Sequence, residues 1–375
     1  MNNIYKAAIV TPVFWPVGAI GYPHYMALSL KENGYDVTVH TMNVKPDGNK
    51  IYDDDIWNGI KIIRHSVYGR LGEFAKNWIP YLKEYNLIHF CGGYRHVHST
   101  LGYLTKNKTS TVIFSPFYPV KPRKNKLLEN IAKLYDGSLG KLLFKSCDVI
   151  LAETNVEKDW LKSLGVPEHL IYIIPNPLPE TAFENYDKTK FRIKYNIGNR
   201  KIVFFLGGHS YIKNVELLLK IAPAIDAVFV IGGEGELTEK YKKIVETLQI
   251  TEQIIFPGSF FGEYKKKMEA FASADVVILP SLHEGLGGVL LEGMAQSKPV
   301  LASDVGGLPD VVPDKFCLFD LTNTDELIRK LRTLLYDTNY AEYLGNKGRK
   351  KAEKYSYHEI SKKYINLVIS LLSKS

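Results

Sequence analysis

The residues of this sequence that are best suited to chemistry are two glutamates, Glu284 and Glu292, on either side of a glycine-rich turn. If a helix begins near Gly287, the backbone amides of Gly287, Gly288 and Val289 have no acceptor within it and lie at its positive end. Such a helix end binds a phosphate or diphosphate, for which carboxylates are poor ligands. The carboxylates instead suit sugar hydroxyls, which donate hydrogen bonds to them. The local chemistry therefore predicts a diphosphate with a sugar on one side and a ribose on the other.

The elements that would hold this turn form a βαβ unit. The apolar run 276–279 ends at Pro280 and is typical of a strand buried on both faces of a parallel sheet. Apolar residues at helical spacing follow in 289–295, and a second strand, 299–302, leads into a turn that contains Gly306. Open α/β sheets bind ligands at the carboxyl ends of their strands, where the glycine-rich turn would lie.

Length and composition indicate a globular protein of two domains. The chain has 375 residues, of which 45% are hydrophobic and 23% charged. It has no uninterrupted apolar run of about 18 residues, and residues 1–15 lack the apolar core of a signal peptide. The three cysteines, Cys91, Cys147 and Cys317, are far apart and show no disulfide or metal-type spacing. We therefore expect a reduced, cytoplasmic protein.

The net charge of +8 is concentrated in the first half of the chain. Residues 1–175 carry 21 basic and 15 acidic side chains, and the densest basic run, 121–126, precedes an amphipathic segment, 127–144. A solvated helix face explains this pattern, and so does attraction to anionic lipid headgroups or to a phosphorylated acceptor. Nucleic acid is not expected as a partner, because no basic stripe interleaved with aromatic residues is present.

Strand-like and helix-like segments alternate in both halves of the chain. Short apolar runs, each followed by a loop, predict strands at 7–10, 37–39, 87–90, 111–114, 149–152, 171–174, 201–206, 228–231 and 254–256. Two such series predict an α/β protein with two doubly wound parallel sheets. Three prolines in 175–179 form a stiff connector, and we place the domain boundary there.

The segment 284–312, EGLGGVLLEGMAQSKPVLASDVGGLPDVV, resembles the signature of the family-four glycosyltransferases, which are retaining enzymes of the GT-B fold. The family pattern is Glu-Gly-Phe-Gly, apolar residues, Glu-Ala-Met-Ala, a small residue, Pro-Val and later Gly-Gly. This chain departs from the pattern at three positions: Leu286, Gly293 and Ser297. In that family the first glutamate contacts the donor sugar and the second the nucleotide ribose. The resemblance therefore implies that Glu284 is the catalytic residue, which contacts the donor sugar, and that Glu292 contacts the ribose.

The resemblance implies further donor-binding positions, which are Gly18, Gly21, Gly208, His209, Lys213 and Gly258. The family has a glycine loop after its first strand, and it has an Arg and a Lys on the diphosphate in the second domain. Lys213 matches that Lys, whereas Gly208 stands at the Arg position with only His209 nearby. Gly258 lies in the turn where relatives cradle the nucleobase with backbone groups.

Two other sets of polar residues are candidates for an acceptor site or a metal site. Relatives often have a histidine that faces the acceptor just after the strand matching 111–114, but this chain has none there; His89 and Tyr118 are weaker acceptor-side candidates. The triplet 53–55 is acidic and precedes an Asn-Gly turn at 58–59, which favours an exposed turn over a metal site. No metal or other cofactor is expected, because helix amides and basic side chains would neutralise the diphosphate.

The resemblance implies a GT-B fold with an acceptor domain, 1–175, a donor domain, 176–355, and a C-terminal helix, 356–375, that returns to the first domain. It implies a metal-independent, retaining hexosyltransferase that moves a sugar from a nucleotide-diphosphate sugar to a glycan or lipid-linked acceptor, in the cytoplasm or at an anionic membrane surface. A GT-B epimerase or phosphorylase is one alternative. A non-catalytic nucleotide-sugar-binding protein is another, motivated by Gly208 and Phe117, which stand where the family's Arg and acceptor-side region lie.

Overall fold

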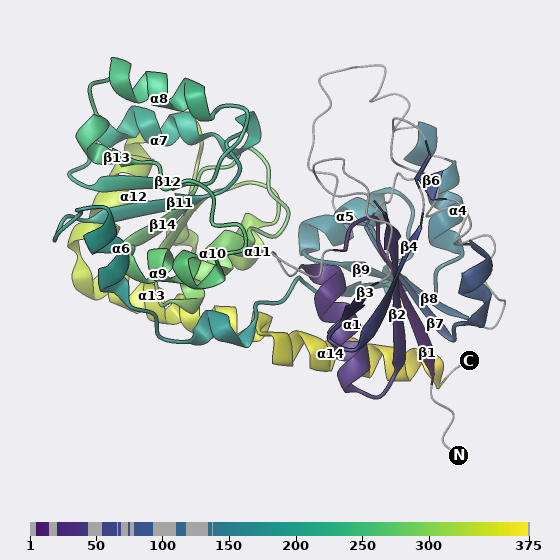
Figure 1. Cartoon of the computed structure of the whole chain (residues 1–375). Coiled ribbons are helices and arrows are strands. Elements are labelled where there is room, and N and C mark those ends of the chain that lie inside the picture. Colours follow the sequence, from purple (N-terminus) through teal and green to yellow (C-terminus); the bar gives the residue numbers. More distant parts are fainter. Residues whose placement is uncertain are drawn as a thin grey trace. The chain divides into compact units, whose positions relative to one another are not determined.

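The computed structural model describes residues 5–14, 21–43, 55–65, 67–68, 74–75, 79–92, 110–117, 134–136 and 138–373. The chain divides into two compact units, which are drawn in Figure 1. The first unit is Met1–Pro177 with Ile360–Ser375, and the second is Leu178–Glu359. Among the described residues, no helix combines the length and the apolar character needed to cross a membrane.

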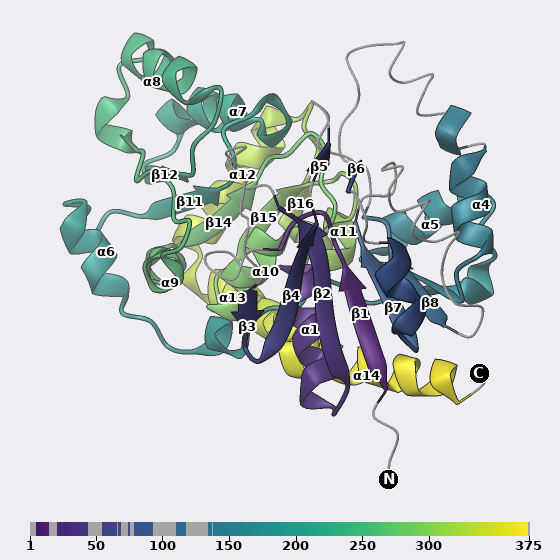
Figure 2. The same cartoon turned by 45° about the vertical axis from the view of Figure 1, so that its right-hand side comes forward.

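The described residues of the first unit form an eight-stranded sheet in the order β10-β9-β8-β7-β1-β2-β4-β3. All neighbouring strands are parallel except β3 and β4, which form a hairpin through the predicted Asn58-Gly59 turn. Figure 2 shows β1, β2 and β4 side by side. The strands are β1 (Lys6–Val10), β2 (Asp36–Met42), β3 (Asp55–Trp57), β4 (Ile60–His65), β7 (Leu87–Cys91), β8 (Thr111–Ser115), β9 (Val149–Ala152) and β10 (Ile171–Ile173).

Helices and one small hairpin complete the described part of the first unit. Its helices are α1 (Tyr22–Glu32), α4 (Leu139–Lys145), α5 (Asn155–Ser163) and α14 (Tyr357–Leu372), and the hairpin is β5 (Val67–Tyr68) with β6 (Phe74–Ala75). Of the predicted amphipathic segment 127–144, the part before Leu134 lies outside the described residues. Helix α14 starts in the second unit and packs on β7 of the first through Tyr364.

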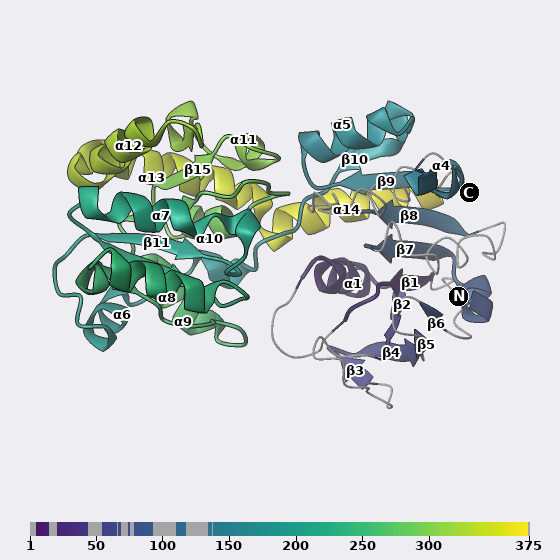
Figure 3. The same ribbon diagram turned by 90° about the horizontal axis from the view of Figure 1, so that it is seen from above.

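The second unit, all of whose residues are described, has a six-stranded parallel sheet in the order β13-β12-β11-β14-β15-β16. Its strands are β11 (Ile202–Leu206), β12 (Val228–Gly232), β13 (Ile254–Ile255), β14 (Val276–Leu279), β15 (Val300–Ser303) and β16 (Leu318–Phe319). Its helices are α6 (Lys188–Lys194), α7 (Val215–Ile221), α8 (Thr238–Thr247), α9 (Tyr264–Ser273), α10 (Gly288–Ala295), α11 (Leu308–Val311), α12 (Thr324–Tyr336) and α13 (Thr338–Ala352). In Figure 1, α7 and α8 cover one face of this sheet and α9 and α10 the other, and Figure 3 shows α12 beside α13.

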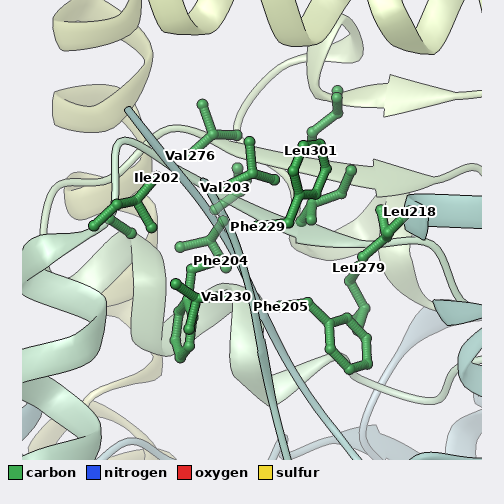
Figure 4. Packing of buried hydrophobic residues seen from close by; sticks show 14 of the residues in the cluster. Ile202, Val203, Phe204, Phe205, Leu218, Phe229, Val230, Val276, Leu279 and Leu301 are labelled. Atoms are coloured by element: carbon green, nitrogen blue, oxygen red, sulfur yellow. The ribbon is translucent and has the colours of Figure 1, made fainter. Parts of the chain in front are cut away.

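Continuous apolar strands form the core of the second unit. Strands β11, β12 and β14 are β-branched or aromatic almost throughout, as is typical of parallel strands that have helices on both faces. Phe204, Phe205 and Phe229 are completely buried, and Figure 4 shows them packed with Leu279 and Leu301. The predicted α/β class with two doubly wound sheets is confirmed.

The departure at Gly293 from the family's alanine has a local physical reason. Gly293 lies on α10 directly above β14, and a methyl group at this position would lie 2.8 Å from Val277 Cγ2. Val277 is fully buried in the middle of the sheet, so its side chain cannot move aside without disturbing its neighbours. Glycine therefore allows α10 to pack closely on the strand that precedes the glycine-rich turn.

We predict that Gly293→Ala destabilises the protein by about 1–3 kcal/mol through overpacking, even though alanine favours a helix by about 1 kcal/mol over glycine. A Val277→Ala background lacks the 2.8 Å contact with Cγ2 and keeps only the 3.1 Å contact with Cβ, so the same substitution should cost clearly less there. Thermal unfolding of the four proteins in this cycle measures both effects. Equal effects of Gly293→Ala in the two backgrounds would contradict the packing explanation.

Candidate functional site

The candidate site of the second unit lies where the strand order reverses. Strands β11 and β14 are adjacent and parallel, and the chain continues from them to opposite sides of the sheet. The loops that follow the two strands therefore lie next to each other at the carboxyl edge of the sheet. A backbone hydrogen bond of 2.7 Å from Leu282 N–H to the Ile212 carbonyl oxygen joins the two loops. The first loop carries Lys213 and the second carries Glu284, so the fold brings together two residues that lie 71 positions apart.

Lys213 and Glu284 form an ion pair between these two loops. Lys213 Nζ lies 2.5 Å from Glu284 Oε2, and Ser281 Oγ donates to the same oxygen at 3.0 Å. The lysine and glutamate side chains are 26% and 14% exposed, so the pair is accessible to a ligand but largely protected from water. The Glu284 carbonyl oxygen accepts the Gly307 N–H at 3.2 Å, which fixes the backbone of the loop independently of the side chain.

Helix α10 begins at the predicted place, directly after the loop that carries Glu284. Gly287 precedes the helix with φ = +71°, and a methyl group there would lie 2.4 Å from Leu308 Cδ2, so both the conformation and the space require glycine. The amides of Gly288 and Val289 belong to the first turn and have no acceptor within the helix. Gly288 is exposed, which leaves this helix end open to an anion.

Glu292 lies further along α10 and is held by a residue that sequence reasoning missed. Lys267 Nζ of α9 lies 2.5 Å from Glu292 Oε1 and 4.6 Å from the centre of the Tyr264 ring. The Glu292 side chain is 14% exposed. Lys267 belongs to no family motif and lies in a run of three lysines, so the sequence carried no signal that distinguishes it.

The turns that contain Gly208, His209 and Gly258 are joined by backbone hydrogen bonds. His209 N–H donates to the Glu234 carbonyl oxygen at 2.9 Å, and Gly233 N–H donates to the Gly258 carbonyl oxygen at 2.9 Å. Ser259 N–H is 3.3 Å from Glu234 Oε1, which places a carboxylate beside Gly258. The three loops at the carboxyl ends of β11, β12 and β13 therefore form one backbone framework.

The His209 side chain lies in the interior and not at the crevice where it was expected to assist the diphosphate. Its ring is completely buried near the rings of Tyr241 and Phe256, and Nδ1 lies 2.9 Å from Thr238 Oγ1. Burial lowers its pKa, although the Gly232 carbonyl group opposes the shift, so the ring is neutral at pH 7. The ring packs the loop, and it offers no cation in place of the missing Arg.

In the first unit the structure describes only part of the predicted set. Gly18 and Tyr118 lie outside the described residues, whereas Gly21 directly precedes α1. His89 was predicted to face an acceptor, but it is fully buried, and its two ring nitrogens lie 2.8 Å from Tyr364 Oη and 2.8 Å from Ser115 Oγ. Burial lowers the pKa of His89 to about 3, so the ring is neutral and can act on an acceptor only through its neighbours.

The described residues contain no group of three or more His, Cys, Asp or Glu side chains that could hold a metal ion. Of the acidic triplet 53–55, only Asp55 is described, and Arg64 Nη2 lies 2.5 Å from its carboxylate.

Comparison with known families identifies the class that this fold and crevice define. Two units with largely parallel α/β sheets are the GT-B architecture. Residues 187–351 match the model of glycosyl transferases group 1, and residues 18–181 match that of glycosyltransferase family 4. Between them the two models take in most of both units, and the chain belongs to this family of glycosyltransferases.

Two relatives illustrate the sequence similarity. An uncharacterized glycosyltransferase of Methanocaldococcus jannaschii is 29% identical over 236 residues, which cover 60% of this chain and 60% of that protein. A sulfoquinovosyl transferase of Arabidopsis thaliana is 31% identical over 239 residues, which cover 61% of this chain and 46% of that protein.

Two solved structures share the fold across nearly the whole chain. Sucrose-phosphate synthase from Thermosynechococcus elongatus has a TM-score of 0.80 at 19% identity and covers 99% of this chain and all of its own. Anabaena HepE, solved in complex with UDP-glucose, has a TM-score of 0.78 at 15% identity and covers 98% of this chain and all of its own.

We predict that the Lys213–Glu284 pair stabilises the second unit by about 0.5–1 kcal/mol, as measured for accessible ion pairs. Thermal unfolding of the wild type, Lys213→Met, Glu284→Gln and the double variant gives this coupling energy. It should shrink in 1 M salt, which screens accessible charges. Additive effects of the two substitutions at low salt would contradict the pairing.

Proposed function

We propose that this protein is a retaining glycosyltransferase that moves a sugar from a nucleotide-diphosphate sugar to a hydroxyl of a glycan or lipid-linked acceptor. The observation that carries the proposal is the Lys213–Glu284 pair beside the first turn of α10, at the switch point of the second sheet. One cation and a helix end suit a diphosphate, and two carboxylates suit the hydroxyls on its two sides.

The proposed roles follow from the positions of these groups. The α10 amides and Lys213 stabilise the negative charge that grows on the diphosphate as it leaves. A bound diphosphate competes with Glu284 for Lys213, while Ser281 continues to hold the Glu284 carboxylate so that it accepts hydrogen bonds from the donor sugar. Glu292, held by Lys267, accepts hydrogen bonds from the ribose hydroxyls.

In the proposed reaction, the bond between the anomeric carbon and the leaving phosphate oxygen breaks, and a bond from that carbon to the acceptor oxygen forms on the same face. The acceptor hydroxyl proton moves to the leaving phosphate, so no histidine base is required. Retention is supported by the family signature. A uridine nucleotide is the first donor to test, because HepE, which shares the fold, binds UDP and UDP-glucose.

We further propose that the acceptor is reached at the cytoplasmic face of an anionic membrane. In the first unit, α4 carries exposed Lys141 and Lys145 beside Leu142, which is 45% exposed. Cationic and apolar side chains on one exposed segment are typical of surfaces that contact lipid headgroups.

A non-catalytic nucleotide-sugar-binding protein is the alternative that one observation favours. Gly208 replaces the family's Arg, and His209 does not compensate for it because its ring is buried. This alternative predicts donor binding without turnover, so binding and turnover are tested separately.

A thermal-shift screen of UDP, GDP, ADP and their sugar conjugates tests binding. A ligand at about 100 times its Kd stabilises the native state by about 2.7 kcal/mol, which raises the melting temperature by several degrees. Lys213→Ala and Glu292→Ala should each lose the shift, whereas Lys243→Ala, an exposed lysine of α8, should retain it. The absence of a shift from every nucleotide would argue against the proposed donor site.

Turnover is tested with Glu284→Gln. We predict that this variant keeps the nucleotide-induced thermal shift but lowers kcat for nucleoside diphosphate release at least about 100-fold, the scale seen when an electrostatic group at a reacting centre is removed. NMR of the product should show the anomeric configuration of the donor. Unchanged turnover in Glu284→Gln, or an inverted product, would overturn this mechanism.

A further inference from the structure

The three consecutive lysines 265–267 lie in the first turns of α9, and the helix gives them different neighbours. Successive residues of a helix point in directions about 100° apart. Lys266 pairs at the surface with Glu263, and its side chain is 57% exposed. Lys267 instead reaches Glu292 of α10, and its side chain is only 20% exposed. The geometry therefore distinguishes Lys267 from the lysines beside it.

The ammonium group of Lys267 is held by two groups at once. Its Nζ lies 2.5 Å from Glu292 Oε1 and 4.6 Å from the centre of the Tyr264 ring. The face of an aromatic ring attracts a cation, and Tyr264 packs against the core of the second unit. Two attractive partners restrict a side chain that is otherwise flexible, so Lys267 offers Glu292 a cation in a defined place.

Glu292 is held through one of its two carboxylate oxygens. Within the described part of the chain, Lys267 donates the only hydrogen bond to this carboxylate, and it does so at Oε1. A carboxylate has about four acceptor positions on its two oxygens. The ion pair therefore fixes the orientation of the group and leaves most of its acceptor positions for a ligand.

The ion pair also joins two elements that are predicted to hold the nucleoside. Helix α9 follows the loop 256–263, which contains Gly258 of the predicted nucleobase turn, and Glu292 of α10 is the predicted ribose contact. The two helices are in contact. A bound diphosphate would compete for Lys213, but Lys267 lies outside both loops that are predicted to hold the diphosphate. Lys267 can therefore keep Glu292 in place while a nucleotide is bound.

We propose that Lys267 is a positioning residue that makes the donor site selective for ribonucleotides over 2′-deoxyribonucleotides. The neighbouring 2′ and 3′ hydroxyls of a ribose can each donate a hydrogen bond to a carboxylate whose orientation is fixed. A 2′-deoxyribose leaves one of these acceptor positions unpaired in a protected place, which costs affinity. The inference rests on the proposed function, because it takes Glu292 as the ribose contact.

The test compares nucleotide affinities by isothermal titration calorimetry. The probes are UDP, GDP and ADP, each beside its 2′-deoxy counterpart, and the readout is the ratio of the two Kd values for each base. For the base that binds, the wild type should prefer the ribonucleotide at least about tenfold, the lower limit for a hydrogen bond to a charged group. Lys267→Met should lower this ratio about fivefold, because the ligand must then immobilise the Glu292 side chain itself.

Two controls separate positioning from a structural role. Lys266→Met removes the neighbouring lysine, which pairs at the surface, and should leave the ratio unchanged. In a Glu292→Gln background, Lys267→Met should change the ratio less than about twofold, because no carboxylate is left to position. Both Kd values of a ratio come from the same protein, so a partly unfolded variant does not change it.

The outcomes distinguish this role from the proposed function. If the wild type binds none of these nucleotides, the proposed donor site fails and the role of Lys267 fails with it. If the wild type prefers ribonucleotides and Lys267→Met weakens both members of a pair equally, Lys267 is structural and only this inference is overturned. Equal affinity of the wild type for both members would also overturn the selectivity, although nucleotide binding itself would stand.

Discussion

The reversal of strand order between β11 and β14 is the constraint on which the second unit depends. At this point adjacent parallel strands send their chains to opposite faces of the sheet, so no helix covers the space above their carboxyl ends. Residues distant in sequence, such as Lys213 and Glu284, meet there because each lies in a loop that follows one of these two adjacent strands. Gly293 permits α10 to pack closely on β14, and this packing fixes the position of the first turn of α10 relative to the sheet.

The charges of the crevice are arranged in matched pairs before any ligand is present. Each of the two glutamates has its own lysine, Lys213 for Glu284 and Lys267 for Glu292, and both carboxylates are 14% exposed. Pairing lowers the cost of holding carboxylates in a protected place, since an unpaired buried charge is strongly unfavourable. It also keeps the side chains in defined positions, which reduces the entropy that a ligand would otherwise have to remove.

The sequence predicts those secondary-structure elements that have a clear local pattern. Strands such as β14 and the start of α10 follow from apolar runs and glycines, and the structure confirms both. The roles of Glu284 and Lys213 come from the family signature and stay predictions, although the fold brings the two side chains together. Lys267 was missed because nothing local distinguishes it from the lysines beside it. His209 and His89 were expected at ligand-facing positions, but their rings are buried. His209 lies in a loop, where no local pattern predicts the direction of a side chain, whereas His89 lies within β7, a strand whose residues are all buried. For His89 the deciding partner, Tyr364, is 275 residues away.

That distance has a consequence for how the protein is made. The second unit is a continuous stretch, Leu178–Glu359, whereas the first unit is completed only by residues from Ile360 onward. During synthesis the ribosome has therefore finished the whole second unit before α14 exists to receive His89. Until then His89 of the first sheet lacks its hydrogen-bond partner Tyr364, and the first unit is incomplete. This incomplete state is the one that cellular chaperones or proteases would act on. Helix α14 is therefore added to the first unit only after the second unit has been translated, and loss of Tyr364 would damage the half of the molecule that was translated first.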